Sequence, residues 1–483
     1  MPSRARPSVL DSVFLAELEA AVGPANVRTD DASRQIYGTD ALKRGHPADV
    51  VVFPGTTLDV AAVVRVCAAH REPIVPRGGG SGYTGGSVPL RGGVVLSLER
   101  MNRILEIDQV NLLAVVEPNV VTGDLQDAVE RVGLFYPPDP SSLRLSAIGG
   151  NVAECAGGPR AFKYGTTKHY VLGLEAVLPT GEIIETGGKV VKNVVGYDLT
   201  HLLVGSEGTL AIITKVVLRL VPRPQVQTTI RACFTDVSGA VRAVTNIIKE
   251  RVVPAALELV DGDSLDAVAA ALGTRSLAPE KTGAILLLEV DGGPAAVAED
   301  ATRVERACRD AAAIEVRRAA DDQERAELWR VRRELSLSLR MIAPVKYNHD
   351  VVVPRGRIPE LFALVDRLKA QFGLRIPSFG HAGDGNIHVN IMSDPQRPGE
   401  IERAHEAERA LFEGVVSLEG AISGEHGIGF SKARFLEIEL SQDEIALMKR
   451  IKQAFDPLGI LNPGKIFPEP ANLPAGPAVR DGE

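Results

Sequence analysis

The chain has 483 residues, of which 45% are hydrophobic and 24% charged, and its formal net charge is −8. This length exceeds one ordinary hydrophobic core, so we expect two domains or one domain with a large cap. The composition is typical of a soluble globular protein. The acidic balance argues against a nucleic-acid binder, which normally carries a basic face.

Residues 1–10 contain arginines but no apolar core, so we expect no signal peptide, and apolar runs such as 285–288 are too short to span a membrane. The four cysteines are widely spaced and include no C-x-x-C pair. This spacing excludes an iron–sulfur site made by this chain alone and suits a reducing compartment. We therefore expect a cytoplasmic protein with free thiols at Cys67, Cys155, Cys233 and Cys308.

The first half of the chain, after a helical segment over 1–46, is dense in glycine and in short β-branched runs. Its pattern predicts a helix over 57–69 and strands over 50–53, 94–97, 114–117 and 212–220. This favours an α+β module rich in loops. The Pro222-Arg223-Pro224 segment predicts a boundary, because proline ends regular strand pairing.

Beyond this boundary the elements become longer and alternate. We predict strands over 228–234, 255–260, 284–290 and 350–353. We predict helices over 237–250, 295–312, 321–342, 358–372 and 442–455. This order fits a sheet covered on one face by helices. The tail after 467 is rich in proline and alanine and is expected to be disordered.

The 76–86 loop follows an apolar pair and has six glycines in its last nine positions. Such a loop exposes successive backbone N–H groups, which is what a diphosphate needs from its host. It matches neither G-x-G-x-x-G opening a helix nor a P-loop. Alone, it would serve equally well as a mobile surface loop. Two further glycine-rich regions, 146–158 and 205–209, lie farther along the chain.

A third motif carries metal-ligand chemistry. His381 and His388 flank Gly383-Asp-Gly-Asn386, whose composition is that of a tight turn and can fold one histidine back towards the other. After the turn His388 and Asn390 alternate with aliphatic residues, so strand pleat points both polar side chains to one face. Glu425 completes a His, His, carboxylate set that suits a divalent metal.

His426 follows Glu425 directly, and glycines on both sides permit a sharp bend. One residue can then bind the metal while its neighbour acts as a base. A lone histidine is more often a hydrogen-bonded structural residue than a ligand. Three of the nine histidines lie in these two short segments, however, which favours a metal site without identifying the metal.

The motifs occur in an order that resembles the FAD-binding oxidases of the vanillyl-alcohol oxidase and p-cresol methylhydroxylase fold. Within that group the chain is most similar to the flavin subunit of bacterial glycolate oxidase and to D-lactate and D-2-hydroxyglutarate dehydrogenases. The resemblance rests on the 76–86 loop, Asp139-Pro-Ser-Ser, Gly149-Gly-Asn, Gly205-Ser-Glu-Gly, the 381–390 turn, 424–429 and Asn462-Pro-Gly-Lys.

This resemblance implies an α+β flavoprotein with two domains. An FAD-binding domain is expected over 47–224 and a substrate (cap) domain over 225–467, whose end returns to the flavin, with a disordered tail over 468–483. Residues implied to hold the diphosphate are Pro76, Arg77, Gly78, Gly79, Gly80, Ser81 and Gly82. Others implied along the FAD are Asp139, Ser142, Gly149, Gly150 and Asn151, with Glu207 and Gly208 near the adenine and Asn462 near the isoalloxazine.

The family's covalent members tether FAD through a histidine or cysteine in matching loops. The 76–86 loop has neither, so we expect non-covalent FAD. By the same resemblance Arg332, three places after Trp329, binds the substrate carboxylate, Lys346 lines the site, and Ser336 is a weaker contact. The guanidinium fork suits a carboxylate, although arginines on a charged helix more often form a solvated face.

The implied reaction is oxidation of a small 2-hydroxy acid, glycolate or D-lactate, to the 2-oxo acid. Hydride passes to flavin N5, and a divalent metal (Zn, Mn or Fe) on His381, His388 and Glu425 acidifies the hydroxyl. His426 takes the proton, and Asn390 orients the substrate. No nicotinamide fingerprint is visible, so a quinone, a cytochrome or another electron-transfer partner is expected as the acceptor.

The resemblance also implies companion flavin and iron–sulfur subunits, with at most peripheral membrane association. Three alternatives stay open on the sequence. The substrate can be D-2-hydroxyglutarate, which needs extra cations for its second carboxylate. The chain can be a non-catalytic FAD-binding subunit, although such a subunit should lack the metal and base motifs. A metal-dependent hydrolase would leave the three glycine-rich regions unexplained.

Overall fold

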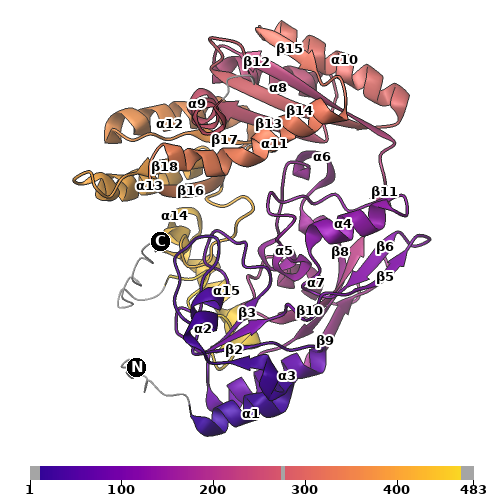
Figure 1. The fold of residues 1–483 in the computed structure, drawn as a ribbon, viewed down its shortest axis with the longest axis vertical. Helices are drawn as coiled ribbons and strands as arrows, with labels where there is room; N and C mark the ends of the chain where they lie inside the picture. Colours follow the sequence, from indigo (N-terminus) through magenta and orange to yellow (C-terminus); the bar gives the residue numbers. More distant parts are fainter. Residues whose placement is uncertain (1–10, 274–277, 469–483) are drawn as a thin grey trace.

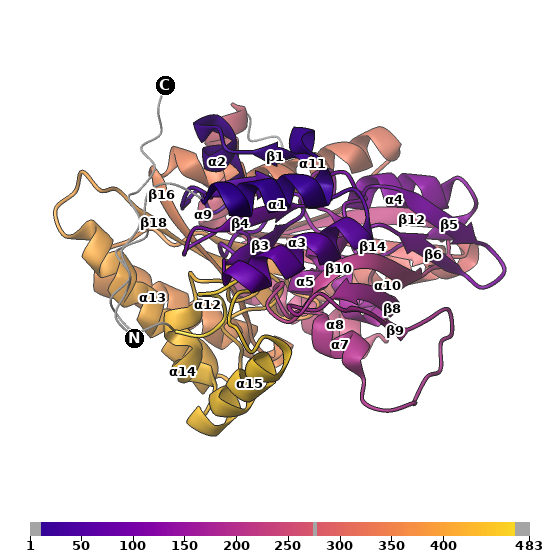
Figure 2. The same ribbon diagram turned by 90° about the horizontal axis from the view of Figure 1, so that it is seen from below.

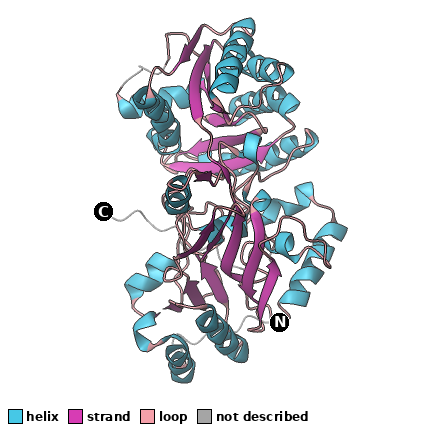
Figure 3. Cartoon of the chain, turned by 90° about the vertical axis from the view of Figure 1, so that its right-hand side faces the viewer, coloured by secondary structure: helices cyan, strands magenta, loops and turns pink. Residues whose placement is uncertain are grey.

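The computed structural model describes residues 11–273 and 278–468, arranged as two bodies stacked along the long axis of the molecule (Figures 1 and 3). Residues 11–222, together with the C-terminal segment, form the lower body in Figure 1, and the large sheet that begins at β12 forms the upper one. The predicted tail, 468–483, lies outside the described residues except for Pro468.

A four-stranded sheet in the lower body carries the 76–86 loop. Its strand order is β1-β2-β4-β3, and β2, β4 and β3 run parallel. The strands are β1 (Val27–Arg28), β2 (Val50–Val52), β3 (Ile74–Arg77) and β4 (Val94–Ser97). Helix α3 (Thr57–His70) connects β2 to β3 and begins with a capping box made by Thr56 and Asp59. The glycine-rich loop therefore leaves the carboxyl end of a parallel strand, where α/β sheets commonly bind ligands.

Helix α1 (Ser12–Val22) packs on α3 through Phe14 and Leu18, and α2 (Asp31–Tyr37) follows it. Beside this layer lies a five-stranded antiparallel sheet of order β5-β6-β10-β8-β9. Its strands are β5 (Ile104–Asp108), β6 (Leu113–Val116), β8 (Val171–Val177), β9 (Ile183–Gly187) and β10 (Ile212–Arg219). Helices α4 (Thr122–Glu130), α5 (Ile148–Glu154) and α7 (Leu199–Leu203) contribute to its core.

The upper body is built on a seven-stranded antiparallel sheet of order β15-β12-β14-β13-β17-β18-β16. The strands are β12 (Val226–Phe234), β13 (Ala256–Asp261), β14 (Ala284–Gly292), β15 (Glu315–Arg318), β16 (Val345–Val352), β17 (Ser378–His381) and β18 (Asn386–Ser393). One face is covered by α8 (Val237–Lys249), α10 (Pro294–Asp310), α12 (Ile358–Phe372) and α13 (Glu400–Ser417), which share the largest apolar core.

This helical layer agrees with the predicted sheet covered by helices, and the predicted α+β class is confirmed. In addition, α9 (Gly262–Leu272) and α11 (Asp322–Ser338) contact each other and cover part of the opposite face. The predicted helix over 321–342 divides into α11 and a short 3-10 turn, Leu339–Met341. Strand β16 begins at Val345, five residues before the predicted start, and α13 was not predicted.

Among the described residues, α6 (Ala161–Tyr164) and the C-terminal return of the chain both connect the bodies. Short α6 reaches up from the lower body, where the Tyr164 hydroxyl donates to Asp291 at 2.7 Å. After α14 (Leu436–Glu439) and α15 (Gln442–Phe455), the chain returns to the four-stranded sheet. There the Ile74 N–H donates to Ile460 at 2.9 Å and the Asn462 N–H donates to Ile74 at 2.8 Å.

No helix in the described residues is long and apolar enough to cross a membrane. All four cysteines are free thiols, as predicted. The strand β7 (Leu134–Phe135) pairs with β11 (Val221–Pro222), so Pro222 ends the last strand before the upper sheet begins.

Candidate active site

The two histidines of the 381–390 motif meet because β17 and β18 form a hairpin. His381 pairs with Asn386 across the turn, as its composition predicted. The turn depends on Gly385, whose φ is +88° and whose added Cβ would lie 2.0 Å from the Val353 carbonyl oxygen. The result brings the rings of His381 and His388 to 5.3 Å between centroids.

Glu425 and His426 reach the hairpin because Asp350 of β16 organises their loop. One Asp350 oxygen accepts the backbone N–H groups of Gly424, Glu425 and His426 at 2.9, 2.7 and 2.9 Å. Its other oxygen is paired with the Lys432 ammonium. Burial alone would raise the pKa of Asp350. The nearby His426 and Lys432 side chains and the backbone N–H of Glu425 hold this pKa well below its usual value. Asp350 is one of the site residues that the sequence did not single out, and Glu258 is another.

Replacement of Asp350 by asparagine is expected to lower the free energy of unfolding by about 3–5 kcal/mol, because the buried Lys432 ammonium then has no counter-charge. Urea denaturation measures the loss. The double variant Asp350→Asn, Lys432→Met should recover part of it, since no unpaired charge remains. Equal stability of the wild type and the single variant would show that this ion pair does not hold the loop.

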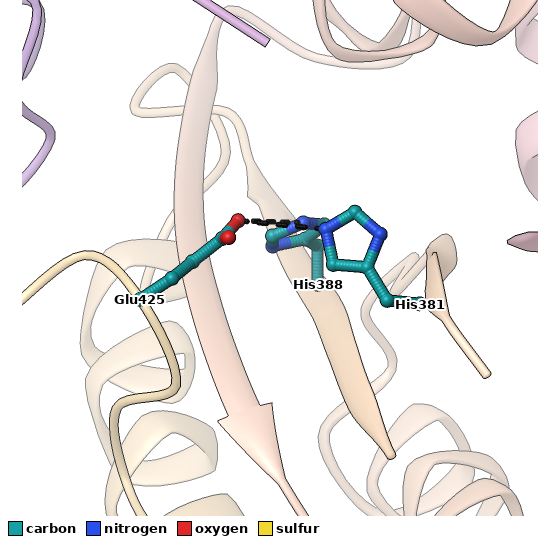
Figure 4. Close-up of side chains that lie close together, drawn as sticks. All are labelled: His381, His388 and Glu425. Atoms are coloured by element: carbon teal, nitrogen blue, oxygen red, sulfur yellow. Dashed lines mark ion pairs between the residues drawn. The ribbon is translucent and has the colours of Figure 1, made fainter. Parts of the chain in front are cut away.

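Glu425 points at both histidines (Figure 4). Its Oε1 lies 3.5 Å from His381 Nε2 and 3.6 Å from His388 Nε2. One donor atom from each of the three residues lies within 4.8 Å of the others. Burial alone would raise the pKa of Glu425, but the neighbouring histidines lower it to about 2, so the carboxylate stays ionised. Two imidazole nitrogens and one carboxylate oxygen fit Zn, Mn or Fe and leave coordination positions open.

Glu258 of β13 fixes the protonation pattern of His381. The imidazole Nδ1 lies 2.5 Å from one Glu258 oxygen, and Arg332 Nε donates to the other at 2.6 Å. Burial would raise the pKa of Glu258, but the charges of Arg332 and His381 lower it to about 2. Nδ1 therefore carries a proton and Nε2 faces Glu425, which is the orientation that a metal-binding histidine needs.

Glu258→Gln is expected to weaken metal binding by about 10- to 100-fold, because the amide keeps the hydrogen bond to His381 but removes the charge. Titration against a metal-sensitive chelator measures this affinity. Glu289→Gln is a matched control, since Glu289 is a buried carboxylate on β14 that accepts from Trp329. An unchanged affinity for Glu258→Gln would contradict the supporting role of Glu258.

His426 lies at the junction of the metal cluster and the lower body. Its ring stacks on His388 at 5.4 Å with an interplanar angle of 14°, and the Tyr83 ring lies 5.5 Å away. His426 Nδ1 is 3.4 Å from Asp350 Oδ1, while Thr84 donates to the His426 carbonyl oxygen at 3.0 Å. The imidazole thus lines the large cleft of the lower body beside Glu425.

This cleft encloses about 1220 Å³ including its open mouth, and all three glycine-rich regions line it. The segment 78–80 lies against the start of α5, and an added Cβ at Gly79 would stand 2.2 Å from the Leu145 carbonyl oxygen. No described residue accepts a hydrogen bond from the N–H groups of 78–80. Gly150 faces open space, with nothing within 4 Å of an added Cβ. A long ligand with a phosphate segment fits such a lining.

Most residues predicted to hold the cofactor line this cleft, and two do not. The Asp139 carboxylate turns to Arg160, whose backbone N–H it accepts at 3.1 Å. Asn462 lies behind the lining and donates to the carbonyls of Gly86 and Glu207 at 2.9 and 2.8 Å. Those that line it are Pro76, Arg77, Gly78, Gly79, Gly80, Ser81, Gly82, Ser142, Gly149, Gly150, Asn151, Glu207 and Gly208.

Glu207, expected near an adenine, lines the cleft and contacts the segment that follows His426. Its two oxygens accept the N–H groups of Ile428 and Gly429 at 2.7 and 2.6 Å. Glu154 also lines the cleft there, and its buried Oε2 has no hydrogen-bond partner among the described residues. Burial, reinforced by the charge of Glu207, raises the pKa of Glu154 well above its usual value.

The structure places Arg332 and Lys346 on the same side of the upper sheet as the histidines. The Arg332 guanidinium lies 4.9 Å from the Phe379 ring centroid and is held by Glu258. Lys346 donates to the Ser336 hydroxyl at 2.6 Å. Burial lowers the pKa of Lys346 to about 8.

Asn390, predicted to orient the substrate, has its amide engaged by neighbouring groups. Its amide nitrogen donates to the carbonyls of Pro377 and His388, and its oxygen accepts from Asn348 at 3.1 Å. Asn390 therefore bonds within the sheet. Asn348 is the residue with a free group, because its buried Oδ1 has no partner in the described part of the chain.

Comparison with known proteins identifies the family of this chain. Residues 48–187 match the model of the FAD binding domain, and residues 223–466 match the C-terminal domain of FAD linked oxidases. The chain belongs to the FAD-linked oxidases. It is therefore an FAD-dependent oxidoreductase, and the predicted family resemblance is confirmed.

Similar curated proteins span nearly the whole chain. The glycolate oxidase subunit GlcD of Bacillus subtilis is 42% identical over 93% of this chain and 95% of its own length. GlcD of Escherichia coli K12 is 39% identical over 95% and 91%, and a D-lactate dehydrogenase of Anaerostipes hadrus is 36% identical over 92% and 95%. Substrate-bound p-cresol methylhydroxylase shares the fold, with a TM-score of 0.78 at 20% identity over 94% of this chain and 96% of that one.

Proposed function

We propose that this FAD-linked oxidase converts a small 2-hydroxy acid, glycolate or D-lactate, to the 2-oxo acid. The observation that carries the proposal is the convergence of His381, His388, Glu425 and His426 at one end of the cleft. A hydroxy acid there would meet a metal-binding set and a candidate base beside the flavin. The glycolate oxidase subunits and D-lactate dehydrogenase among the relatives support this substrate class.

FAD would be bound without a covalent link in the glycine-lined cleft. Gly78 lies near Ala147 and Gly150 at the start of α5, and the free N–H groups of 78–80 would receive the diphosphate there. When bound, the flavin supplies the hydride acceptor at N5. Its reactive ring would lie at the Glu207 and His426 end, because the candidate base must reach the substrate there.

The metal would be held by His381 Nε2, His388 and Glu425. When bound, it acts as a Lewis acid that lowers the pKa of the substrate hydroxyl. His426 would take the hydroxyl proton, since its ring lines the cleft and is not needed as a ligand. Asp350 lies 3.4 Å from Nδ1 and would orient the ring so that Nε2 is directed towards the substrate.

Arg332 and Lys346 would bind the substrate carboxylate. Glu258 fixes the Arg332 side chain, so its remaining N–H groups are oriented before the substrate arrives. Asn348 offers a buried acceptor on the same strand as Lys346 and would complete the polar wall in place of Asn390. With two cations, one could pair with each carboxylate of a dicarboxylic acid, so D-2-hydroxyglutarate is the alternative substrate.

The reduced flavin would pass its electrons to an acceptor other than NAD, through companion subunits of the kind that the name of GlcD implies. The protein would be cytoplasmic, and any association with the inner face of the membrane would be made through these partners. A non-catalytic role is disfavoured, because a subunit without catalytic activity would not require His381 and His388 as metal ligands or Glu258 to orient His381.

Anaerobic mixing with glycolate, D-lactate, L-lactate and D-2-hydroxyglutarate tests the proposed function. The loss of flavin absorbance at about 450 nm reports reduction of the flavin. We expect rapid bleaching by one of the small acids. The absence of bleaching by all four, with FAD and metal both present, would overturn the proposed activity.

A further inference from the structure

An exposed apolar loop projects from the lower body, away from the cleft. It joins β9 to α7 over residues 188–198 and extends from the molecule in Figure 2. Its apolar side chains are largely exposed: Val191 is 73% exposed, Val194 96%, Val195 90% and Tyr197 95%. A contiguous apolar surface of this kind marks an interaction site rather than the scattered exposure of ordinary surfaces.

The loop is fixed at its two ends and open between them. Gly188 donates to the Leu172 carbonyl at 3.0 Å, and Asp198 caps α7 by accepting from the His201 N–H. Within the described chain, the backbone of 190–194 makes no hydrogen bond. This part of the loop therefore presents unpaired N–H and C=O groups beside the exposed side chains of Val190, Val191 and Val194.

These unpaired backbone groups favour a protein as the occupant over a lipid bilayer. In hydrocarbon every unpaired N–H and C=O is costly, and an extended loop cannot satisfy them internally. A protein surface can, by adding the loop to a sheet or groove whose backbone pairs with it. β9 is the outermost strand of its sheet, so the loop continues an edge that is already unpaired.

We propose that residues 190–197 dock a companion protein subunit. The partner surface would be an apolar groove with a carboxylate at its rim, because Lys192 is exposed among the valines, whereas Lys189 already pairs with Glu106. Tyr197 would be the central contact, since an aromatic ring with a hydroxyl suits a desolvated interface. The relatives from Bacillus subtilis and Escherichia coli are named as subunits, which supports a protein partner. The proposal does not depend on the substrate.

A photo-crosslinking amino acid at Val194 tests this surface in the full-length protein, in cells of the source organism. Val110 is the matched control, because it is a 90% exposed valine at the tip between β5 and β6. We expect position 194, and not position 110, to crosslink to one other protein, identified by mass spectrometry. That protein is then purified and mixed with the chain.

In this mixture the variant Val191→Ser, Val194→Ser, Val195→Ser should raise the Kd at least tenfold, and Val110→Ser should leave it unchanged. Lys192→Glu tests the same contact without removing apolar area, and flavin content shows that each variant folds. The proposal is overturned by an unchanged Kd, by crosslinks only to a second copy of the chain, or by no adduct at 194. Co-sedimentation with phosphatidylcholine and phosphatidylglycerol vesicles that the triple variant loses would equally overturn it in favour of lipid.

Discussion

Glu425→Ala is expected to lower kcat by about three orders of magnitude, or about 4 kcal/mol of barrier, while FAD stays bound. Glu425 is the one anionic member of the metal set, and its Oε1 lies 3.5 Å and 3.6 Å from the two histidine nitrogens. Its removal should also reduce the metal content of the purified protein. Steady-state kinetics, flavin absorbance and metal analysis measure the three effects on one sample.

A matched control separates this effect from a general loss of acidic charge. Glu413→Ala removes an exposed glutamate from α13 that pairs with Arg409, and it should leave kcat and metal content unchanged. Loss of FAD from Glu425→Ala would show that Glu425 is structural. Full metal content with normal turnover would remove it from the metal site.

If His426 is the general base, as proposed, His426→Ala is expected to slow flavin reduction by about 10²- to 10⁴-fold and to leave the metal content unchanged. The rate should recover partly with added imidazole, which can enter the space that the side chain leaves. Anaerobic stopped-flow reduction measures the step directly, and metal analysis confirms that His381, His388 and Glu425 still bind.

His405→Ala provides the comparison, since His405 contacts Glu408 and the Tyr347 ring away from the metal cluster. It should reduce flavin at the wild-type rate. If His426→Ala reduced the flavin as fast as the wild type in a single turnover, another group would have to take the proton.

Much of this fold follows from local sequence. The apolar periodicities of 358–372 and 442–455 predict α12 and α15 to the residue, because amphipathic helices keep their pattern without help from neighbours. The Gly383–Asn386 turn predicts the hairpin that joins the histidines, because turn chemistry is also local. Motif order then identifies the family, which the comparisons confirm.

The site residues that the sequence did not predict are those whose neighbours lie far away along the chain. Asp350 looks like an ordinary strand residue, yet it accepts three N–H groups from residues 424–426, more than 70 positions away. No local motif marks Glu258 either. It lies beside His381 only because β13 pairs with β17. Asn390 shares the correct face with His388, but only the packed sheet shows that its amide is already engaged.

The most direct measurement compares metal-loaded protein with chelator-treated protein in anaerobic single-turnover reduction by glycolate and D-lactate. Metal-assisted oxidation predicts fast bleaching by at least one acid in the loaded sample. It also predicts slowing by a factor of about 10³ after chelation and recovery when Zn, Mn or Fe is returned. Equal reduction rates in the two samples, with FAD retained in both, would contradict a catalytic metal at His381, His388 and Glu425.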